Sequence, residues 1–247
     1  MPDSRTHRSS APEDAALFGP SVLPTLREAT WHLGWLWGHG YAERASVALV
    51  GDRFRLVSRQ RDAIRRCACS DAQREARAAK LLSLPELRGR ELAIDGFNVL
   101  ITVESALGGG VVLGARDGCF RDLANLRGTW RRVMETLTAI EIVGEVLALL
   151  GPTQVVWYLD RGVSNSGRLR GFLERVAAER RYAWVAHLSD RVDRELRATR
   201  AVVASADSGV IDACGAWVNL ARHVVCERVP SAWMVDLSSR TLPAGRD

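Results

Sequence analysis

Three aspartates, Asp95, Asp160 and Asp207, each stand at or just after the end of a short apolar run in the sequence. Runs of this length and composition are typical of buried strands in a parallel β-sheet. The carboxyl ends of such strands meet at one edge of the sheet, and ligands of open α/β folds bind at that edge. The sequence therefore predicts that the three carboxylates lie together at a ligand-binding edge.

Carboxylates gathered in this way favour a divalent cation, because their like charges repel one another. Mg²⁺ or Mn²⁺ binds a few carboxylate oxygens, keeps several waters and engages substrate phosphates. Such an ion lowers the pKa of a bound water and stabilises the transition state of phosphodiester hydrolysis. We therefore expect Asp95, Asp160 and Asp207 to be catalytic and metal-binding, with Mg²⁺ or Mn²⁺ as the cofactor. A further metal ligand is expected from the long segment after the first strand, which holds Glu104, Asp117 and Asp122.

Three polar side chains near the same strand ends are candidates for substrate binding. Asn98 lies three residues after Asp95, where it is placed to orient that carboxylate or to hold a phosphate. Ser164 and Ser208 stand near expected helix N-termini, whose free N–H groups bind phosphate oxygens. A structural alternative stays open, because Asp207 is also well placed to serve as an ordinary helix N-cap.

Positive charge is concentrated in the N-terminal part of the chain. Residues 1–90 hold 15 basic and 10 acidic side chains, whereas residues 91–247 hold 19 of each. Arginine binds phosphate through paired hydrogen bonds and stacks on bases, so this basic region favours an anionic polymer such as a nucleic acid as the partner. The alternative is an arginine surface that is merely solvated. The expected substrate contacts are Arg59, Arg61, Arg65 and Arg66.

The periodicity of the apolar residues changes near residue 91. Before that point, helical spacing predicts helices over residues 23–39, 42–50, 58–67 and 70–82. After it, strands alternate with helices, which is the pattern of a parallel α/β sheet. Strands are expected at residues 92–95, 154–159, 184–188, 201–204, 223–226 and 233–237.

The stretch between the first two expected strands is unusually long. Residues 98–130 read as an irregular connection in which three glycines, at 108–110, form a hairpin turn or a lid, and a helix over 130–150 follows. The expected organisation is thus a disordered tail (1–20), a small all-helical basic domain (21–84), a linker (85–90) and an α/β domain (91–247).

Several classes of protein are disfavoured by composition. There is no apolar run of 18 residues, so we expect no membrane span, and residues 1–20 lack the apolar centre of a secretory signal. The five cysteines include no CxxC pair, which argues against a zinc site or a disulfide framework and favours a reducing, cytoplasmic location. Neither a GxGxxG step after the first strand, nor a P-loop, nor a GxSxG elbow occurs.

Three motifs resemble those of the NYN branch of the PIN-like ribonucleases. They are Ile-Asp-Gly-Phe-Asn-Val-Leu at 94–100, Val-Val-Trp-Tyr-Leu-Asp at 155–160, and Ser-Ala-Asp-Ser at 205–208 followed by Ile211. The resemblance covers residues 91–226 and implies a three-layer α/β/α domain with a central parallel sheet and metal-dependent cleavage of RNA. The whole chain also resembles a set of two-domain proteins known only as domains of unknown function. The segment after the first strand is longer than a simple PIN-like unit needs, so spacing cannot assign the fourth carboxylate.

The sequence therefore favours a divalent-metal-dependent endoribonuclease whose basic helical region binds the nucleic acid. The alternative is a non-catalytic RNA-binding or protein-interaction module, in which the aspartates serve as helix caps. The oligomeric state, a homo-oligomer included, is left open.

Overall fold

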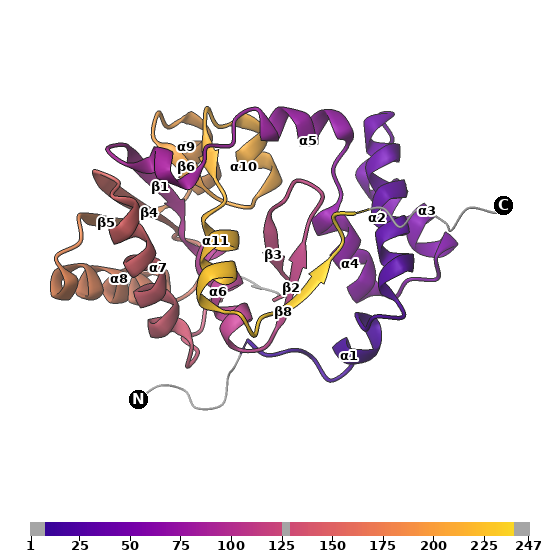
Figure 1. The fold of residues 1–247 in the computed structure, drawn as a ribbon, viewed down its shortest axis with the longest axis horizontal. Coiled ribbons are helices and arrows are strands. Elements are labelled where there is room, and N and C mark those ends of the chain that lie inside the picture. The colour runs from indigo at the N-terminus through magenta and orange to yellow at the C-terminus, as the bar shows by residue number, and fades with distance from the viewer. Residues whose placement is uncertain (1–7, 125–128, 240–247) are drawn as a thin grey trace.

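The computed structural model describes residues 8–124 and 129–239 of the 247-residue chain. Its centre is a five-stranded sheet in the order β5-β4-β1-β6-β7, in which all neighbouring strands run parallel (Figure 1). Ile94 of β1 lies opposite Trp157 of β4 and Ala204 of β6, so these strands end close together. The strands are β1 (Glu91–Asp95), β4 (Gln154–Asp160), β5 (Trp184–Ser189), β6 (Val202–Ala204) and β7 (Trp217–Val218).

Helices pack on both faces of this sheet because successive β1 side chains point to opposite sides. Leu92 and Ile94 join a large apolar cluster with α6, α7, α8 and α11, whereas Ala93 joins a smaller one with α9 and α10. The mixed α/β class and the parallel central sheet are therefore as expected. The helices are α6 (Gly96–Leu107), α7 (Thr136–Leu150), α8 (Ser166–Arg180), α9 (Val192–Ala198), α10 (Ser208–Ala213) and α11 (Leu220–Arg228).

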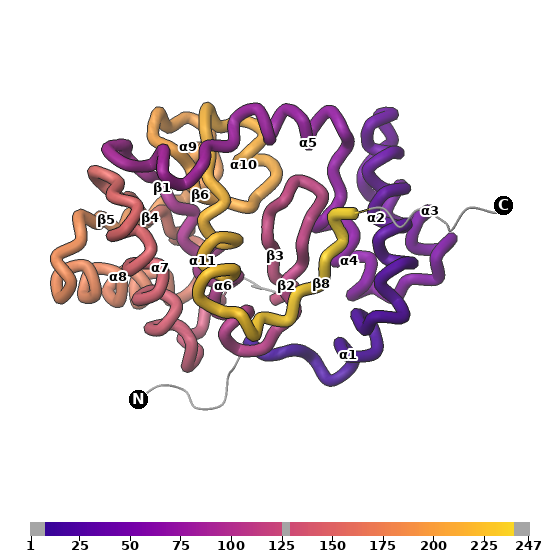
Figure 2. Tube along the Cα trace, viewed as in Figure 1, coloured from indigo at the N-terminus to yellow at the C-terminus, as the bar shows by residue number. Residues whose placement is uncertain are grey.

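A second, three-stranded sheet lies between the five-stranded sheet and the N-terminal helices, as the trace in Figure 2 shows. Strand β2 (Val111–Gly114) pairs antiparallel with β3 (Phe120–Asp122) and parallel with β8 (Trp233–Asp236). The β2–β3 turn contains Gly118 with a φ of +80°, a conformation that glycine adopts without strain.

The N-terminal helices pack on this second sheet. Leu33 of α2 and Ile64 of α4 belong to one apolar cluster with Val111 and Leu113 of β2 and Val235 of β8. The helical region is therefore present as expected, and its core is completed by strands from the C-terminal part of the chain. Its helices are α1 (Asp14–Leu17), α2 (Leu23–Gly38), α3 (Glu43–Arg53), α4 (Ser58–Cys67), α5 (Asp71–Ala78) and the 3-10 helix η1 (Leu84–Leu87).

The expectation of a disordered tail over residues 1–20 is wrong for residues 8–20. They include helix α1, and Asp14 and Phe18 are 0% and 1% exposed. Phe18 packs in the same apolar cluster as α2 and α4, and the Asp14 carboxylate is ion-paired with Arg59. Residues 1–7, which the expected tail also included, lie outside the described residues.

The expectation of an irregular connection over 98–130 is also wrong for most of its length. Residues 96–107 form α6, in which Val99, Leu100 and Val103 face the core at helical spacing, and β2 and β3 follow. The three glycines at 108–110 join α6 to β2, and the hairpin turn lies further on, between β2 and β3. Residues 125–128 of this stretch lie outside the described residues.

One further element and two helix boundaries differ from the expectation. Residues 223–226, expected as a strand, belong to helix α11, whose buried Leu220, Ala221, Val224 and Val225 recur at helical spacing. Helix α7 begins at Thr136 rather than at residue 130, and α5 ends at Ala78 rather than near residue 82.

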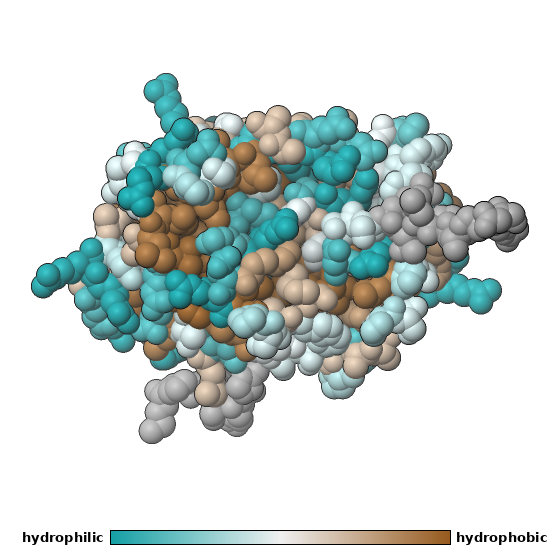
Figure 3. All heavy atoms as spheres, in the orientation of Figure 1, coloured by the Kyte–Doolittle hydropathy of each residue, from teal (hydrophilic) through white to brown (hydrophobic). Residues whose placement is uncertain are grey.

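The surface in the view of Figure 3 is mostly hydrophilic, with an apolar patch over α7, a helix on which Leu149 is 69% exposed. None of the helices in the described part of the chain has both the length and the apolarity needed to cross a membrane.

Candidate functional site

The carboxyl ends of β1, β4 and β6 open into one cavity of about 640 Å³. Asp95, Asp160 and Asp207 all line it, so the structure brings together the three aspartates that the sequence singled out. We call this space the acidic cavity. Its aspartates are Asp95, Asp122, Asp160, Asp190, Asp193 and Asp207.

Asp95 ends β1 and also begins α6, because its carboxylate caps that helix. Its Oδ1 accepts a hydrogen bond of 3.4 Å from the Asn98 N–H, and its Oδ2 accepts one of 2.9 Å from the Ser205 hydroxyl. Glycine is required at position 96, between β1 and α6, because the chain passes close to β4 there. A Cβ on Gly96 would lie 2.5 Å from a Leu159 methyl and 3.0 Å from the Tyr158 carbonyl oxygen. The Asp-Gly-x-Asn sequence thus places a carboxylate where strand and helix meet.

The pKa of Asp95 is raised to about 7. Burial is the main cause, the hydrogen bonds from Ser205 and Asn98 oppose it, and the negative charges of Asp207 and Asp193 add to it. Within the described residues Asp95 forms no ion pair with an arginine or lysine. A carboxylate held in this way lacks a compensating positive charge.

The loop after β6 is bound tightly to the start of α6. The Asn98 side-chain oxygen accepts a 2.8 Å hydrogen bond from the Ala206 N–H, and the Ser205 hydroxyl oxygen accepts one of 3.0 Å from the Asp207 N–H. Asp207 in turn caps α10 by accepting a 2.9 Å hydrogen bond from the Val210 N–H. These bonds fix Asp95 and Asp207 relative to each other.

Asp160 is the most open of the three predicted catalytic residues. It is exposed, and its Oδ1 accepts a 2.7 Å hydrogen bond from the Gly162 N–H in the turn that follows β4. Its carboxylate therefore borders the acidic cavity from an exposed turn.

Of the three candidates for a further metal ligand, only Asp122 lines the acidic cavity. Its carboxylate accepts hydrogen bonds from the Ala124 N–H at 2.8 Å and the Thr102 hydroxyl at 3.3 Å, and burial raises its pKa. Glu104 lies further along α6, fully buried, where it is paired with Arg8 and accepts a 2.6 Å hydrogen bond from the Thr136 hydroxyl. Its charge is already compensated there.

Asp117 lies in the β2–β3 turn and is held by two arginines. Arg77 Nη1 is 2.5 Å and Arg121 Nη2 is 2.7 Å from its Oδ2, and its side chain is 1% exposed. Although burial alone would raise its pKa, the charges of Arg121 and Arg77 lower it to about 2. Asp117 does not line the acidic cavity, and its ion pairs connect the β2–β3 turn to α5 and β3.

The donor set of the acidic cavity suits Mg²⁺ or Mn²⁺ in chemical type. It offers carboxylate oxygens, and the charges of Asp95 and Asp207 are close enough to influence each other. Among residues 8–124 and 129–239, however, no three His, Cys, Asp or Glu side chains form a ready-made metal cluster. The residues fit an ion held by one or two carboxylates with water filling its other positions, which is how proteins commonly bind Mg²⁺.

The four predicted arginine contacts fall into two pairs. Arg59 forms two hydrogen bonds to the buried Asp14 carboxylate, at 2.5 and 2.8 Å, and Arg61 contacts Asp52 at 2.7 Å and the Leu56 carbonyl at 2.8 Å. These two arginines hold the N-terminal helices together and do not line the acidic cavity.

The other two arginines line a second cavity of about 560 Å³ beside the first. Arg65 lines the second cavity but not the acidic one. Arg66 lines both cavities and donates a 2.9 Å hydrogen bond to the Asp122 carbonyl. We call the second space the basic cavity after its four arginines, and four acidic residues also line it: Glu43, Asp122, Asp207 and Asp212. It is lined by side chains that include Trp37, Tyr41, Arg65, Arg66, Arg77 and Arg121.

The two predicted serines are separated. Ser208 lines the basic cavity, with Arg121 Nη2 3.4 Å from its hydroxyl oxygen. Ser164 is exposed outside both cavities, and its carbonyl oxygen accepts a 3.1 Å hydrogen bond from the Trp130 N–H. The helix near whose N-terminus it was expected begins two residues later, at Ser166, with Asn165 at the N-cap position.

Sequence reasoning missed several residues of the acidic cavity. Ser205, which connects Asp95 to the Asp207 backbone, stood inside a quoted motif without a role. Asp190 directly follows β5 and Asp193 lies in the first turn of α9, so the strand-end rule that found Asp95 also applied here. Arg197 lies near Gly209 at the start of α10, where a Cβ would be 2.7 Å from its Nη2, and no sequence signal pointed to it.

Fold and cavity together define a mixed α/β protein with a carboxylate-lined site at the end of its parallel sheet. The chain belongs to the family described as a domain of unknown function, DUF5616, whose model matches residues 84–223. A second model, described as a protein of unknown function, DUF434, matches residues 25–80. The uncharacterised protein MJ0935 of Methanocaldococcus jannaschii is 28% identical over 191 residues, which are 76% of this chain and 89% of that protein. No solved structure matches the chain significantly.

Proposed function

We propose that the acidic cavity binds Mg²⁺ or Mn²⁺ and hydrolyses phosphodiester bonds in RNA, as an endoribonuclease. The observation that carries this proposal is the convergence of Asp95, Asp160 and Asp207, from three parallel strands, on a single cavity. The resemblance of residues 94–100, 155–160 and 205–208 to the NYN branch of the PIN-like ribonucleases supports it from the sequence. That resemblance also implies the PIN-like, three-layer form of the α/β fold.

Each residue of the site has its own role in the proposed reaction. Asp95 and Asp207 hold the ion, and Ser205 and Asn98 keep the Asp95 carboxylate in place through their hydrogen bonds. A bound divalent ion supplies a water of lowered pKa and neutralises charge on the phosphate. Asp160 borders the same cavity from the open side and is free to accept a proton from an attacking water.

RNA as substrate is supported by the arginines around the two cavities. Arg66 borders both cavities, and Arg191, Arg194 and Arg197 border the acidic one. A cytoplasmic location is part of the same proposal. It is supported by the five free cysteines, of which Cys67, Cys69, Cys119 and Cys214 are buried.

One observation favours a second candidate function, a non-catalytic module that binds RNA or a protein. Asp95 caps α6 and Asp207 caps α10, so both carboxylates have structural work to do without a metal ion. Asparagine caps a helix as well as aspartate does, but carries no charge. Asn substitution therefore removes metal binding while leaving the caps in place.

The test compares the wild type with Asp95→Asn and Asp207→Asn for cleavage of a mixed RNA pool, with and without Mn²⁺. Asp52→Asn is the matched control, because Asp52 is an exposed acid in α3 that lines neither cavity. We expect Mn²⁺-dependent cleavage by the wild type and the control, and a loss of at least about 100-fold in both cavity variants, consistent with loss of a few kcal/mol of transition-state stabilisation. Equal cleavage by all four proteins would show that the acidic cavity does not catalyse it, and no cleavage with Mn²⁺ favours the binding module instead.

A further inference from the structure

The basic cavity adjoins the acidic one. Arg66, Asn98, Asp122 and Asp207 line both, so groups bound in the two cavities lie on either side of the same four residues. The basic cavity has a volume of about 560 Å³, within the range of small-ligand sites. It is lined by residues of the N-terminal helices on one side and by residues of α6, β3, α10 and the loop before α10 on the other.

Two positive charges of the basic cavity are available to a ligand. Arg77 and Arg121 are occupied by Asp117, and Arg77 also by Asp212. Arg65, by contrast, is 43% exposed and forms only loose ion pairs, at 3.6 Å with Glu43 and 4.0 Å with Asp62, which a phosphate can replace. Arg66 shows a single hydrogen bond, to a carbonyl, within the described residues, and no ion pair there.

Two N–H donors of the cavity lining are buried without a hydrogen-bond partner in the described part of the chain. They are the Nε of Arg66 and the Nε1 of Trp37. Leaving a buried donor unpaired is unfavourable, so an acceptor that reaches it after a small side-chain rotation gains binding free energy. Tyr41 borders the same cavity and is 56% exposed, so its ring is open to a flat ligand group.

We propose that the basic cavity binds one nucleotide of a single-stranded RNA whose adjacent phosphodiester lies in the acidic cavity. Arg65 and Arg66 contact its phosphate, and Tyr41 and Trp37 contact its base. A base must be unpaired to stack on an aromatic ring, so the site selects single strands over duplexes. This inference rests on the proposed function for the position of the scissile bond, and its test is chosen to stand apart from cleavage.

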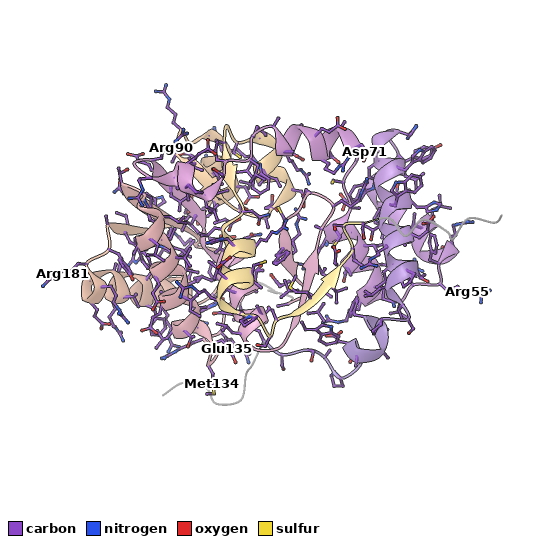
Figure 4. All side chains as sticks on the ribbon, viewed as in Figure 1. Arg55, Asp71, Arg90, Met134, Glu135 and Arg181 are labelled. Carbon is purple, nitrogen blue, oxygen red and sulfur yellow. The ribbon has the colours of Figure 1, made fainter. Side chains whose placement is uncertain are left out.

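The test is binding of a fluorescein-labelled single-stranded RNA of ten nucleotides, followed by anisotropy in EDTA at several salt concentrations. The phosphate contact is tested with Arg66→Gln, and its control is Arg90→Gln, because Arg90 extends into solvent away from both cavities (Figure 4). Loss of one phosphate contact should weaken binding and lower the slope of log affinity against log salt by about one. Arg90→Gln should leave both unchanged.

The base contact is tested with Tyr41→Ala, and its control is Trp35→Ala. Trp35 is a half-exposed aromatic residue of α2 that lines neither cavity. Loss of one stacked base should weaken binding about tenfold or more. Both variants change exposed side chains, so each should fold normally.

The outcomes separate the two proposals. If Arg66→Gln and Tyr41→Ala bind like their controls, or if a duplex of the same sequence binds as tightly as the single strand, the nucleotide site does not exist. If RNA is still cleaved in that case, the endoribonuclease proposal stands without the nucleotide site. Single-strand binding that depends on Arg66 and Tyr41, without any Mn²⁺-dependent cleavage, supports the nucleotide site and rejects the nuclease.

Discussion

Asp95 and Asp117 are two enclosed aspartates with opposite environments. Asp117 lies between Arg77 and Arg121, and its pKa falls to about 2, whereas Asp95 has no such neighbour and its pKa rises to about 7. Burial acts in the same direction on both carboxyl groups, so the difference comes from the neighbouring charges: arginines beside Asp117, and Asp207 and Asp193 near Asp95. An enclosed carboxylate with its own cations stabilises the fold, and one without them is available to a cation from outside.

The largest change in stability should follow from replacing Asp117, whose charge is compensated by two arginines. Asp117→Asn leaves Arg77 and Arg121 buried with one carboxylate fewer, which should lower the free energy of unfolding by about 3–5 kcal/mol. The control is Asp212→Asn, because the Asp212 side chain is 36% exposed and water can replace it beside Arg77, so its loss should be clearly smaller. Urea unfolding at pH 7 measures both, and equal losses would contradict the distinction.

Replacing Asp95 should raise the free energy of unfolding, whereas replacing Asp117 should lower it. The Asp95 pKa of about 7 exceeds its ordinary value of 3.8, so the folded protein binds this proton more tightly than the unfolded chain does. The protonated Asp95 side chain therefore contributes fully to the stability of the fold below pH 4, and this contribution is lost as pH rises through 7. Without metal, Asp95→Asn should therefore gain about 4 kcal/mol in unfolding free energy over the wild type between pH 4 and pH 8.

Urea unfolding in EDTA at the two pH values measures this gain. Asp52→Asn again serves as the control, because its carboxylate is 75% exposed and pairs with Arg61 outside both cavities. A difference between the wild type and Asp95→Asn that stays the same at both pH values would show that Asp95 is ionised throughout, as Asp117 is.

The sequence predicted the sheet and the convergence of its aspartates because both depend on local patterns. The apolar runs before Asp95, Asp160 and Asp207 identify parallel strands, and the parallel direction alone brings their ends together. Ser70 and Gln73 likewise have the spacing of a capping box, and the structure shows both of its hydrogen bonds.

What the sequence could not supply was the partner of each charge. Arg59 and Arg66 look alike in the sequence, yet Arg59 binds Asp14, 45 residues away, while Arg66 borders both cavities. Glu104 and Asp122 likewise differ only in what the fold brings to them: Arg8 pairs with the first, and the second borders the acidic cavity. These contacts are set by tertiary packing between distant segments, which spacing along the chain does not encode.

The central claim is that Asp95 exchanges its proton for a metal ion. Calorimetric titration with Mn²⁺ at pH 7, repeated in two buffers of different ionisation enthalpy, counts the protons released on binding. With a pKa of about 7, Asp95 should release roughly half a proton per ion in the wild type, because a metal-bound carboxylate must be deprotonated. Asp95→Asn should bind Mn²⁺ much more weakly and release no such proton. Binding of equal strength with equal proton release in both proteins would contradict the account.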